Sequence, residues 1–234
     1  MKLNYRNFEN PDLRSNPTVI NEVICGLILE KYINTTCELV VGDKPDKNLP
    51  DIYSSDEKFG YEVTNCEAKP DFHHRDYLKE LSKLDFDLDK IKNSKIDLSN
   101  YNDIFTTVEN NIITSTRLCV LFHKNDWMLC NYKKCIDKKL TKLNNGNYRG
   151  CQNISLIILS VARLSGLEDA KFLQKAFQTV YRNHNKKYDN LYFFTTHDIF
   201  NITKDNIQTI RHYKNDEFGQ IIETSKKILG IPLI

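Results

Sequence analysis

Residues 49–67 read LPDIYSSDEKFGYEVTNCE, and their pattern predicts a β-hairpin at the centre of the fold. Two runs with strand propensity, Pro50 to Ser54 and Phe59 to Cys66, flank the polar turn Asp56-Glu57-Lys58. If the turn is centred between Asp56 and Glu57, Asp51 lies directly opposite Glu62. Side chains alternate along a strand, so both carboxyl groups are expected on one face of the hairpin.

Two carboxylates at opposed positions require a positive charge between them. Their Cβ atoms would lie about 4.5–5.5 Å apart, a separation at which like charges repel. Mg²⁺ or Mn²⁺ suits such oxygen ligands, and the backbone carbonyl of Val63 would add a third. A metal held there would activate a water and offset charge on a phosphoryl group. The alternative is that Asp51 and Glu62 are solvated acids on an outer face.

The segments around the hairpin predict an α/β sandwich around a mixed sheet. Helices are expected after the Asn16-Pro17 cap up to Ile33, and over Asp71–Lys92, Val108–Phe122, Asn131–Asn144, Leu167–Asn183 and Thr224–Leu229. Further strands are expected over Thr36–Val41, Ile154–Val161 and Leu191–Thr196, the second of them buried on both faces. We therefore expect one domain over residues 1–234, with residues 67–130 as a mainly helical insertion.

The hairpin also carries a motif with a known counterpart. Pro50-Asp51, followed by Glu62-Val63-Thr64 and preceded by a helix that holds Glu22, resembles the signature of PD-(D/E)xK nucleases, which include many restriction endonucleases. The resemblance spans residues 16–66 and 131–165. It implies a restriction-endonuclease-like three-layer core and Mg²⁺- or Mn²⁺-dependent hydrolysis of nucleic acid, DNA more than RNA.

The same resemblance implies roles for individual residues. Asp51, Glu62 and the Val63 carbonyl would hold the metal. Glu22 would bind or orient a metal-bound water from the opening helix, with Glu30 as its competitor for that role. The family motif has a lysine where this chain has Thr64, so the catalytic lysine would have to come from another element.

A migrated lysine is known in the family, and the Glu-x-Thr variant resembles the endonuclease domains of some viral cap-snatching polymerases. Helical phase turns Lys79 to solvent but puts Lys139 about 60° from Ile136 and about 40° from Leu143, at the edge of the inward face. We therefore expect Lys139 to act at the site, with Lys142 and Lys138 behind it. The alternative is an ordinary solvated basic face that contacts backbone phosphates.

Composition restricts the partners and the compartment. The 234 residues carry a net charge of only +2, so nucleic-acid contacts must come from local clusters, here Lys138, Lys142, Lys79 and Arg75. No Gly-rich phosphate loop is present, which argues against a nucleotide-driven motor.

Seven cysteines without a CxxC pair predict a reduced protein without a zinc knuckle. No role is assigned to Cys130, Cys135 or His197-Asp198. We expect a cytoplasmic protein without a membrane partner, and a homodimer is left open.

Two other functions remain open at this point. In the first, Thr64 marks a lost active site, and a nuclease-like fold binds nucleic acid or protein through residues 67–130. In the second, the protein binds nucleic acid without metal, through Arg75, Lys79, Lys83 and Lys90. A role in host defence or a mobile element is expected by association alone, because small divergent nucleases often serve there.

Overall fold

The computed structural model describes residues 4–6, 16–40, 50–54, 56, 58–66, 77–94, 104–118, 124–146, 151–161 and 166–231. The chain divides into two compact units. One unit joins Met1–Cys66 to Leu129–Ile234, and the other comprises Glu67–Met128. Each unit is described by itself below.

The first unit is built on an eight-stranded mixed sheet in the order β1-β2-β3-β4-β7-β8-β9-β10. Strands β4, β7 and β8 run parallel at its centre, β1 runs parallel to β2, and the remaining neighbours are antiparallel. The strands are β1 Asn4–Arg6, β2 Cys37–Val40, β3 Ile52–Ser54, β4 Phe59–Asn65, β7 Asn153–Leu159, β8 Leu191–Phe194, β9 Asp198–Ile202 and β10 Ile207–His212.

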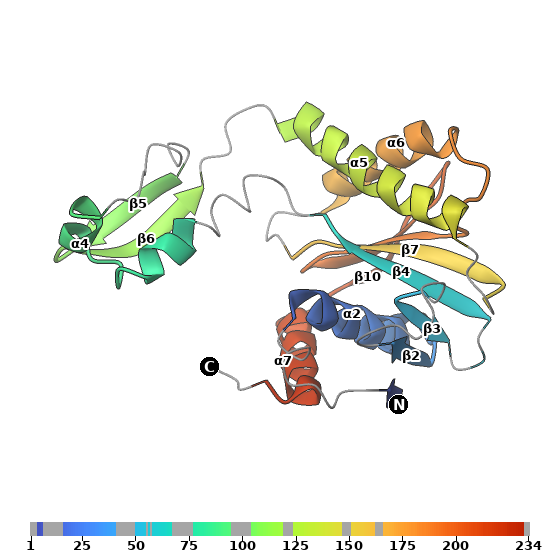
Figure 1. The fold of residues 1–234 in the computed structure, drawn as a ribbon, viewed down its shortest axis with the longest axis horizontal. Helices are drawn as coiled ribbons and strands as arrows, with labels where there is room; N and C mark the ends of the chain where they lie inside the picture. Colours follow the sequence, from blue (N-terminus) through green and yellow to red (C-terminus); the bar gives the residue numbers. More distant parts are fainter. Residues whose placement is uncertain are drawn as a thin grey trace. The chain divides into compact units, whose positions relative to one another are not determined.

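Helices cover both faces of this sheet. Helices α2 (Pro17–Ile28) and α7 (Glu217–Leu229) lie on one face, and α5 (Lys124–Asn145) and α6 (Leu167–Tyr181) lie on the other (Figure 1). The α/β class and the mixed central sheet that the sequence predicts are therefore confirmed. None of the described helices combines the length and hydropathy needed to cross a membrane.

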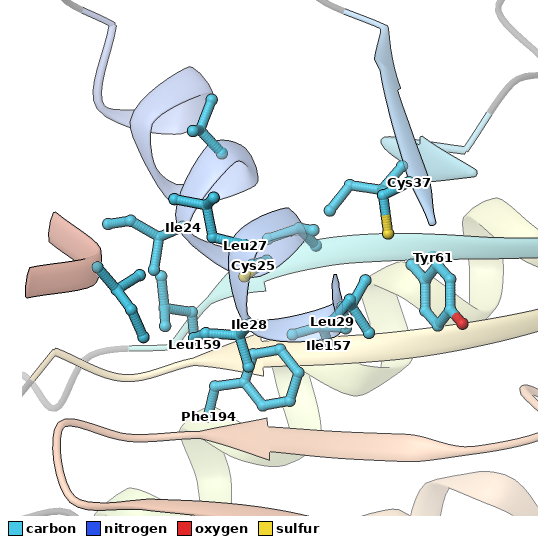
Figure 2. Close-up of a cluster of buried hydrophobic side chains, with 14 of the residues drawn as sticks. Ile24, Cys25, Leu27, Ile28, Leu29, Cys37, Tyr61, Ile157, Leu159 and Phe194 are labelled. Carbon is cyan, nitrogen blue, oxygen red and sulfur yellow. The ribbon is translucent and has the colours of Figure 1, made fainter. Parts of the chain in front are cut away.

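The opening helix forms where its cap signal predicts. The Asn16 side chain accepts a hydrogen bond from the Thr18 amide at 2.9 Å, and Pro17 occupies the first helical position. The apolar face of α2 packs against β7 and β8, where Ile28 meets Leu159 and Phe194 (Figure 2). Past Ile28 the chain widens into the π-helical turn η1 (Leu29–Ile33).

The hairpin has the expected register. Strand β3 pairs with β4 through Ile52 opposite Tyr61 and Tyr53 opposite Gly60. The Asp56 side chain fixes the turn, because it accepts hydrogen bonds from the Ser54 hydroxyl and the Lys58 amide. Continued by one residue, the same register sets Asp51 opposite Glu62.

Gly60 lets the start of this hairpin pack closely. A Cβ atom at Gly60 would lie 2.8 Å from Pro50 Cγ, 2.9 Å from Ile154 Cδ1 and 3.0 Å from Cys151 Sγ. We expect Gly60→Ala to lower the free energy of unfolding by about 1–3 kcal/mol, because the Pro50 ring must move. Urea denaturation of the wild type and the variant measures this. Equal midpoints for the two proteins would contradict the expected crowding.

The second unit differs from its prediction. The described residues hold a helical segment over 77–82, the short helix α4 (Leu88–Lys92) and a two-stranded sheet of β5 (Ile104–Glu109) and β6 (Ile112–Leu118). The helix expected over Val108–Phe122 is therefore wrong, and the described insertion is mixed rather than mainly helical. The β-branched residues pair as a hairpin because Asn110 and Asn111 adopt positive φ angles of 49° and 66° and reverse the chain.

The helix expected over Asp71–Lys92 is also interrupted. The chain leaves helical geometry after residue 82, and Asp85 and Phe86 adopt positive φ. Backbone hydrogen bonds from Leu88 to Asn111 and from Ile113 to Phe86 tie this turn to the β-hairpin. Tertiary pairing thus overrides the helical periodicity, while residues 67–76 lie outside the described part of the chain.

The carboxyl-terminal region adds elements that the sequence did not predict. Strands β9 and β10 extend the sheet beyond β8, and α7 begins at Glu217 rather than Thr224. The expected strands at 154–161 and 191–196 are present as β7 and β8, each slightly shifted or shorter. Strand β7 lies between two parallel neighbours and is almost wholly buried, as its apolar run predicts.

Candidate functional site

Two buried carboxylates face one another at the start of the hairpin. The side chain of Asp51 is 9% exposed and that of Glu62 is 0% exposed. Asp51 Oδ2 accepts a hydrogen bond of 2.8 Å from the Val63 amide, which fixes the carboxylate against β4. Buried carboxylates are costly unless they are paired, so the charges that meet them determine what this site can do.

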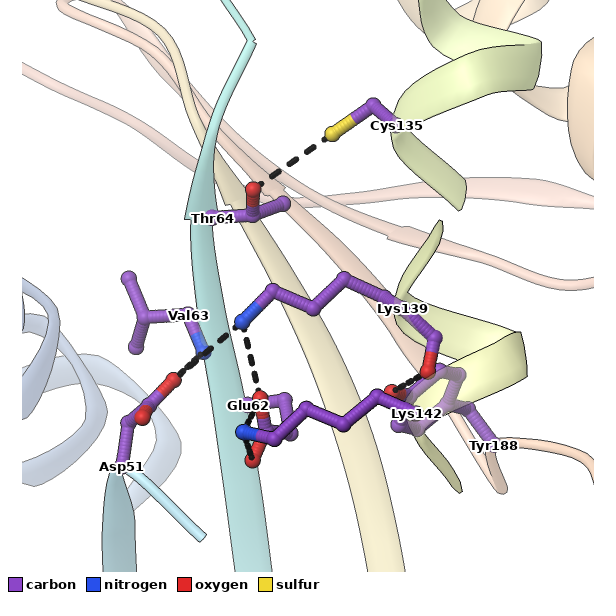
Figure 3. Close-up of polar contacts among 8 residues, drawn as sticks. All are labelled: Asp51, Glu62, Val63, Thr64, Cys135, Lys139, Lys142 and Tyr188. Carbon is purple, nitrogen blue, oxygen red and sulfur yellow. Dashed lines mark hydrogen bonds and ion pairs between the residues drawn. The ribbon is translucent and has the colours of Figure 1, made fainter. Parts of the chain in front are cut away.

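Two lysines from α5 supply positive charge to these carboxylates. Lys139 Nζ lies 2.8 Å from Glu62 Oε2 and 3.4 Å from Asp51 Oδ2, so that one ammonium contacts both acids (Figure 3). Lys142 Nζ lies 2.8 Å from Glu62 Oε1 and 2.9 Å from Oε2. The side chain of Lys139 is 17% exposed and that of Lys142 is 43% exposed, so Lys142 lies on the solvent side.

The packing of α5 explains why these two lysines reach the sheet. Ile136, Leu140 and Leu143 are buried on the face of α5 that meets the strands, and Lys139 lies at the edge of that face. The Tyr188 hydroxyl donates a 2.9 Å hydrogen bond to the Lys139 carbonyl, which fixes the helix at this turn. Burial, with the charges of Glu62 and Asp51, raises the pKa of Tyr188, so its hydroxyl stays a donor.

The lysine remains charged despite its burial. Burial by itself lowers the pKa of Lys139, but the charges of Asp51 and Glu62 and their hydrogen bonds outweigh it, so the net shift is upward. The site therefore holds a protonated lysine beside two acidic groups. A group that is charged and already desolvated is suited to bind an anionic oxygen.

The structure separates the lysine and arginine candidates. Lys139 and Lys142 reach the carboxylates, whereas Lys138 is exposed on α5. Lys79 is exposed within the Glu67–Met128 unit, as its helical phase predicts. Arg75 lies outside the described residues. Only the phase argument for Lys139 identified which lysine the fold brings to the acids.

Glu22 and Glu30, the two acids of the opening helix, occupy different surroundings. Glu22 is buried. The pKa of the Cys25 thiol is raised by burial first and then by the charges of Glu22 and Asp51, so both acids lie near that thiol. Glu30 instead accepts a 3.2 Å hydrogen bond from the amide of Cys37, the first residue of β2. Glu22 is therefore the better placed of the two to support the site.

The donor set fits a hard divalent cation. Asp51 and Glu62 offer carboxylate oxygens of the kind that Mg²⁺ and Mn²⁺ bind. Because a paired strand residue turns its amide and carbonyl to the same neighbour, the Val63 carbonyl faces the side from which Asp51 accepts its amide. Among the described residues no three His, Cys, Asp or Glu side chains gather as a metal-binding group.

Sequence reasoning missed the sulfur contacts beside the acids. Thr64, which stands at the expected lysine position, lies with its Oγ1 3.4 Å from Cys135 Sγ. A side-chain hydrogen bond with Cys66 is the largest influence on the pKa of Cys135 and lowers it. Period-two spacing of Glu62, Thr64 and Cys66 on β4 and the i, i+4 spacing of Cys135 and Lys139 on α5 were the available signals.

Comparison with models of known protein families, with curated proteins and with solved structures gives no match to this chain. A functional assignment therefore has to come from the geometry itself. Its strongest elements are the register that opposes Asp51 to Glu62 and the lysine that contacts both.

Proposed function

We propose that the protein is a metal-dependent nuclease of the PD-(D/E)xK type, in which the lysine comes from α5 instead of β4. The observation that carries the proposal is the contact of Lys139 Nζ with both Asp51 and Glu62, two buried carboxylates from adjacent strands. Thr64 leaves the motif position without a charge, and Lys139 supplies one from the neighbouring helix. DNA is the expected substrate class, ahead of RNA.

Asp51, Glu62 and the Val63 carbonyl would hold one Mg²⁺ or Mn²⁺. When bound, the cation supplies Lewis acidity, which lowers the pKa of water and offsets charge on a phosphoryl group. Lys139 and Lys142 now neutralise the two acids, and a cation at the same oxygens would free the ammonium groups for other anionic partners. Metal and substrate binding are thus expected to reinforce each other.

The lysines then have separate tasks. Lys139 is mostly buried and is positioned to orient the attacking water or an anionic oxygen of the scissile phosphate. A charged hydrogen-bond donor stabilises negative charge more strongly in a desolvated site than in water. Lys142 and Lys138 are more exposed and would contact neighbouring phosphates. Glu22 would support the metal-bound water from α2.

Cleavage assays test this proposal directly. Single- and double-stranded DNA and RNA are incubated with the protein in Mn²⁺, or in chelator alone. We expect cleavage of at least one substrate with Mn²⁺, none in chelator, and a loss of about 10²- to 10³-fold in Asp51→Asn. Glu168→Gln is the matched control, because Glu168 is an exposed acid paired with Lys171. Cleavage that persists in chelator, or unaltered in Asp51→Asn, would contradict the proposal.

One observation favours a second function, a nuclease-like fold without catalysis that binds nucleic acid or protein. Two acids and two lysines already balance in charge, so the cluster is also able to act as a permanent structural ion-pair network. That alternative expects no Mn²⁺-induced stabilisation. Metal-free nucleic-acid binding by Lys83 and Lys90 has less support, because Glu80 and Asp85 pair with them.

A further inference from the structure

Two cysteines, Cys66 after β4 and Cys135 on α5, lie beside the face of β4 that carries Glu62. Glu62, Thr64 and Cys66 alternate along the chain and so share one face of the strand. On α5, Cys135 lies one turn before Lys139 and on the same side of the helix. The two cysteines therefore meet at the same helix–strand junction that brings Lys139 to Glu62.

The contacts at this junction are specific. Cys66 is 8% exposed and directly follows β4, where its amide bonds to the Leu159 carbonyl. The Cys135 sulfur lies 3.4 Å from Thr64 Oγ1, and a hydrogen bond with the Cys66 side chain acts on its pKa. Neither cysteine is part of a disulfide in this structure, so the two sulfurs are present as thiols.

We propose that Cys66 and Cys135 form a redox pair that a peroxide converts to a disulfide, joining β4 to α5 one helical turn from Lys139. The pair itself depends only on the geometry of the two thiols. Its effect on cleavage rests on the proposed nuclease function.

The chemistry needs only hydrogen peroxide as co-reactant. The Cys135 thiolate attacks one peroxide oxygen, so that an S–O bond forms, the O–O bond breaks and hydroxide leaves. The Cys66 sulfur then attacks the resulting sulfenic acid, so that an S–S bond forms, the S–O bond breaks and the oxygen leaves as water. Two thiols are oxidised to one disulfide, and one peroxide is reduced to two waters.

The surroundings of Cys135 favour the first step. The hydrogen bond with Cys66 is the largest influence and lowers the pKa, burial opposes it, and Thr64, Lys139 and Lys138 lower it further, to about 7. A substantial share of this thiol is therefore thiolate at neutral pH. By contrast, burial raises the pKa of Cys25 and Cys37, which makes those two poor competitors.

The disulfide would move α5 and with it the position of Lys139 at the site. An S–S bond of about 2.05 Å is far shorter than a thiol contact, so oxidation draws this turn of α5 toward β4. Lys139 lies on the next turn, and shifts of about 1 Å in a catalytic group are costly. We expect oxidised protein to cleave at least about tenfold more slowly than reduced protein, with recovery after dithiothreitol.

Peroxide titration tests the pair without reference to activity. The protein is treated with hydrogen peroxide, blocked with N-ethylmaleimide, digested without reductant and mapped by mass spectrometry. We expect a Cys66–Cys135 cross-link in the wild type and in Cys130→Ser, the exposed-thiol control. In Cys66→Ser, which keeps a hydroxyl beside the Cys135 sulfur, we expect instead a dimedone-trapped sulfenic acid on Cys135. If the serine variant folds poorly, the wild-type cross-link map decides the pairing by itself.

The outcomes separate the two proposals. A cross-link in a protein that cleaves nothing supports the redox pair and removes the nuclease function. Cleavage that is unchanged by a complete cross-link overturns the proposed effect on the site. Oxidation that leaves Cys66 and Cys135 unlinked in the wild type, or that joins other cysteines first, overturns the redox pair itself.

Discussion

Replacing Lys139 with methionine is expected to lower the rate of Mn²⁺-dependent cleavage by about 10²- to 10³-fold while the affinity for Mn²⁺ is retained or increased. Methionine preserves the apolar stem of the side chain and removes the ammonium. Cleavage loses the hydrogen-bond donor that Lys139 positions. Mn²⁺ binding loses its competitor, because the Lys139 ammonium no longer occupies Asp51 and Glu62. Single-turnover cleavage and a Mn²⁺ titration measure the two effects separately.

The same variant is expected to depend on metal for its stability. Removing one member of a buried ion pair costs about 3–5 kcal/mol, and the low end applies because Lys142 still contacts Glu62. Mn²⁺ should recover much of this loss, since it supplies the missing charge. Lys134→Met is the control, because Lys134 is exposed on the same helix. Reduced Mn²⁺ affinity in Lys139→Met, or equal rates for both variants, would refute the role assigned to Lys139.

Glu62→Gln is expected to have the largest effect on cleavage, a loss of about 10³-fold or more. Glu62 is fully buried and contacts Lys139 and Lys142, so glutamine keeps the shape but removes the one charge that both lysines share. In the proposed site Glu62 both ligates the metal and pairs with Lys139, so its loss would affect two parts of the site together. Cleavage under saturating Mn²⁺ measures the loss, and denaturation with urea reports whether the fold persists.

The control for this variant is Glu168→Gln, an equally conservative change at an exposed acid. We expect it to cleave at the wild-type rate. A folded Glu62→Gln protein that retains cleavage within about threefold of the wild type would exclude Glu62 as a ligand, because removal of one well-placed charged group costs far more.

The centre of the site could be predicted from the sequence because it depends on local rules. A turn closed by Asp56 sets the hairpin register, and that register alone opposes Asp51 to Glu62. Helical phase alone identified Lys139, since Ile136 and Leu143 define the buried side of α5. Each inference needed only residues close in sequence and one periodicity.

The remaining features depend on tertiary contacts that no local pattern contains. The meeting of Cys66 with Cys135 requires the docked position of α5, which packing against β7 and β8 sets, as in the edge-to-face contact of Tyr132 with Phe193. Strands β9 and β10 are short and pair in succession beyond β8. Their sequences lack the long apolar run that marked β7.

The error in the second unit has a different cause. The segment from Ile104 to Leu118 mixes Ile, Thr and Val, which favour strands, and it has no clean period, so the helix predicted over Val108–Phe122 had no periodic pattern behind it. The Asn110-Asn111 pair was the available turn signal, since asparagine tolerates positive φ better than most residues. Together with the β-branched composition, that pair indicates the β5–β6 hairpin.

The central claim is that Asp51 and Glu62 bind one divalent cation, and a Mn²⁺ titration followed by thermal unfolding tests it most directly. At 100 times the dissociation constant, binding adds about 2.7 kcal/mol. For a chain of this size, that raises the unfolding temperature by roughly 5–10 °C. We expect this rise in the wild type and in Glu168→Gln, and no rise in Asp51→Asn. No rise in the wild type, or an equal rise in Asp51→Asn, would contradict the claim.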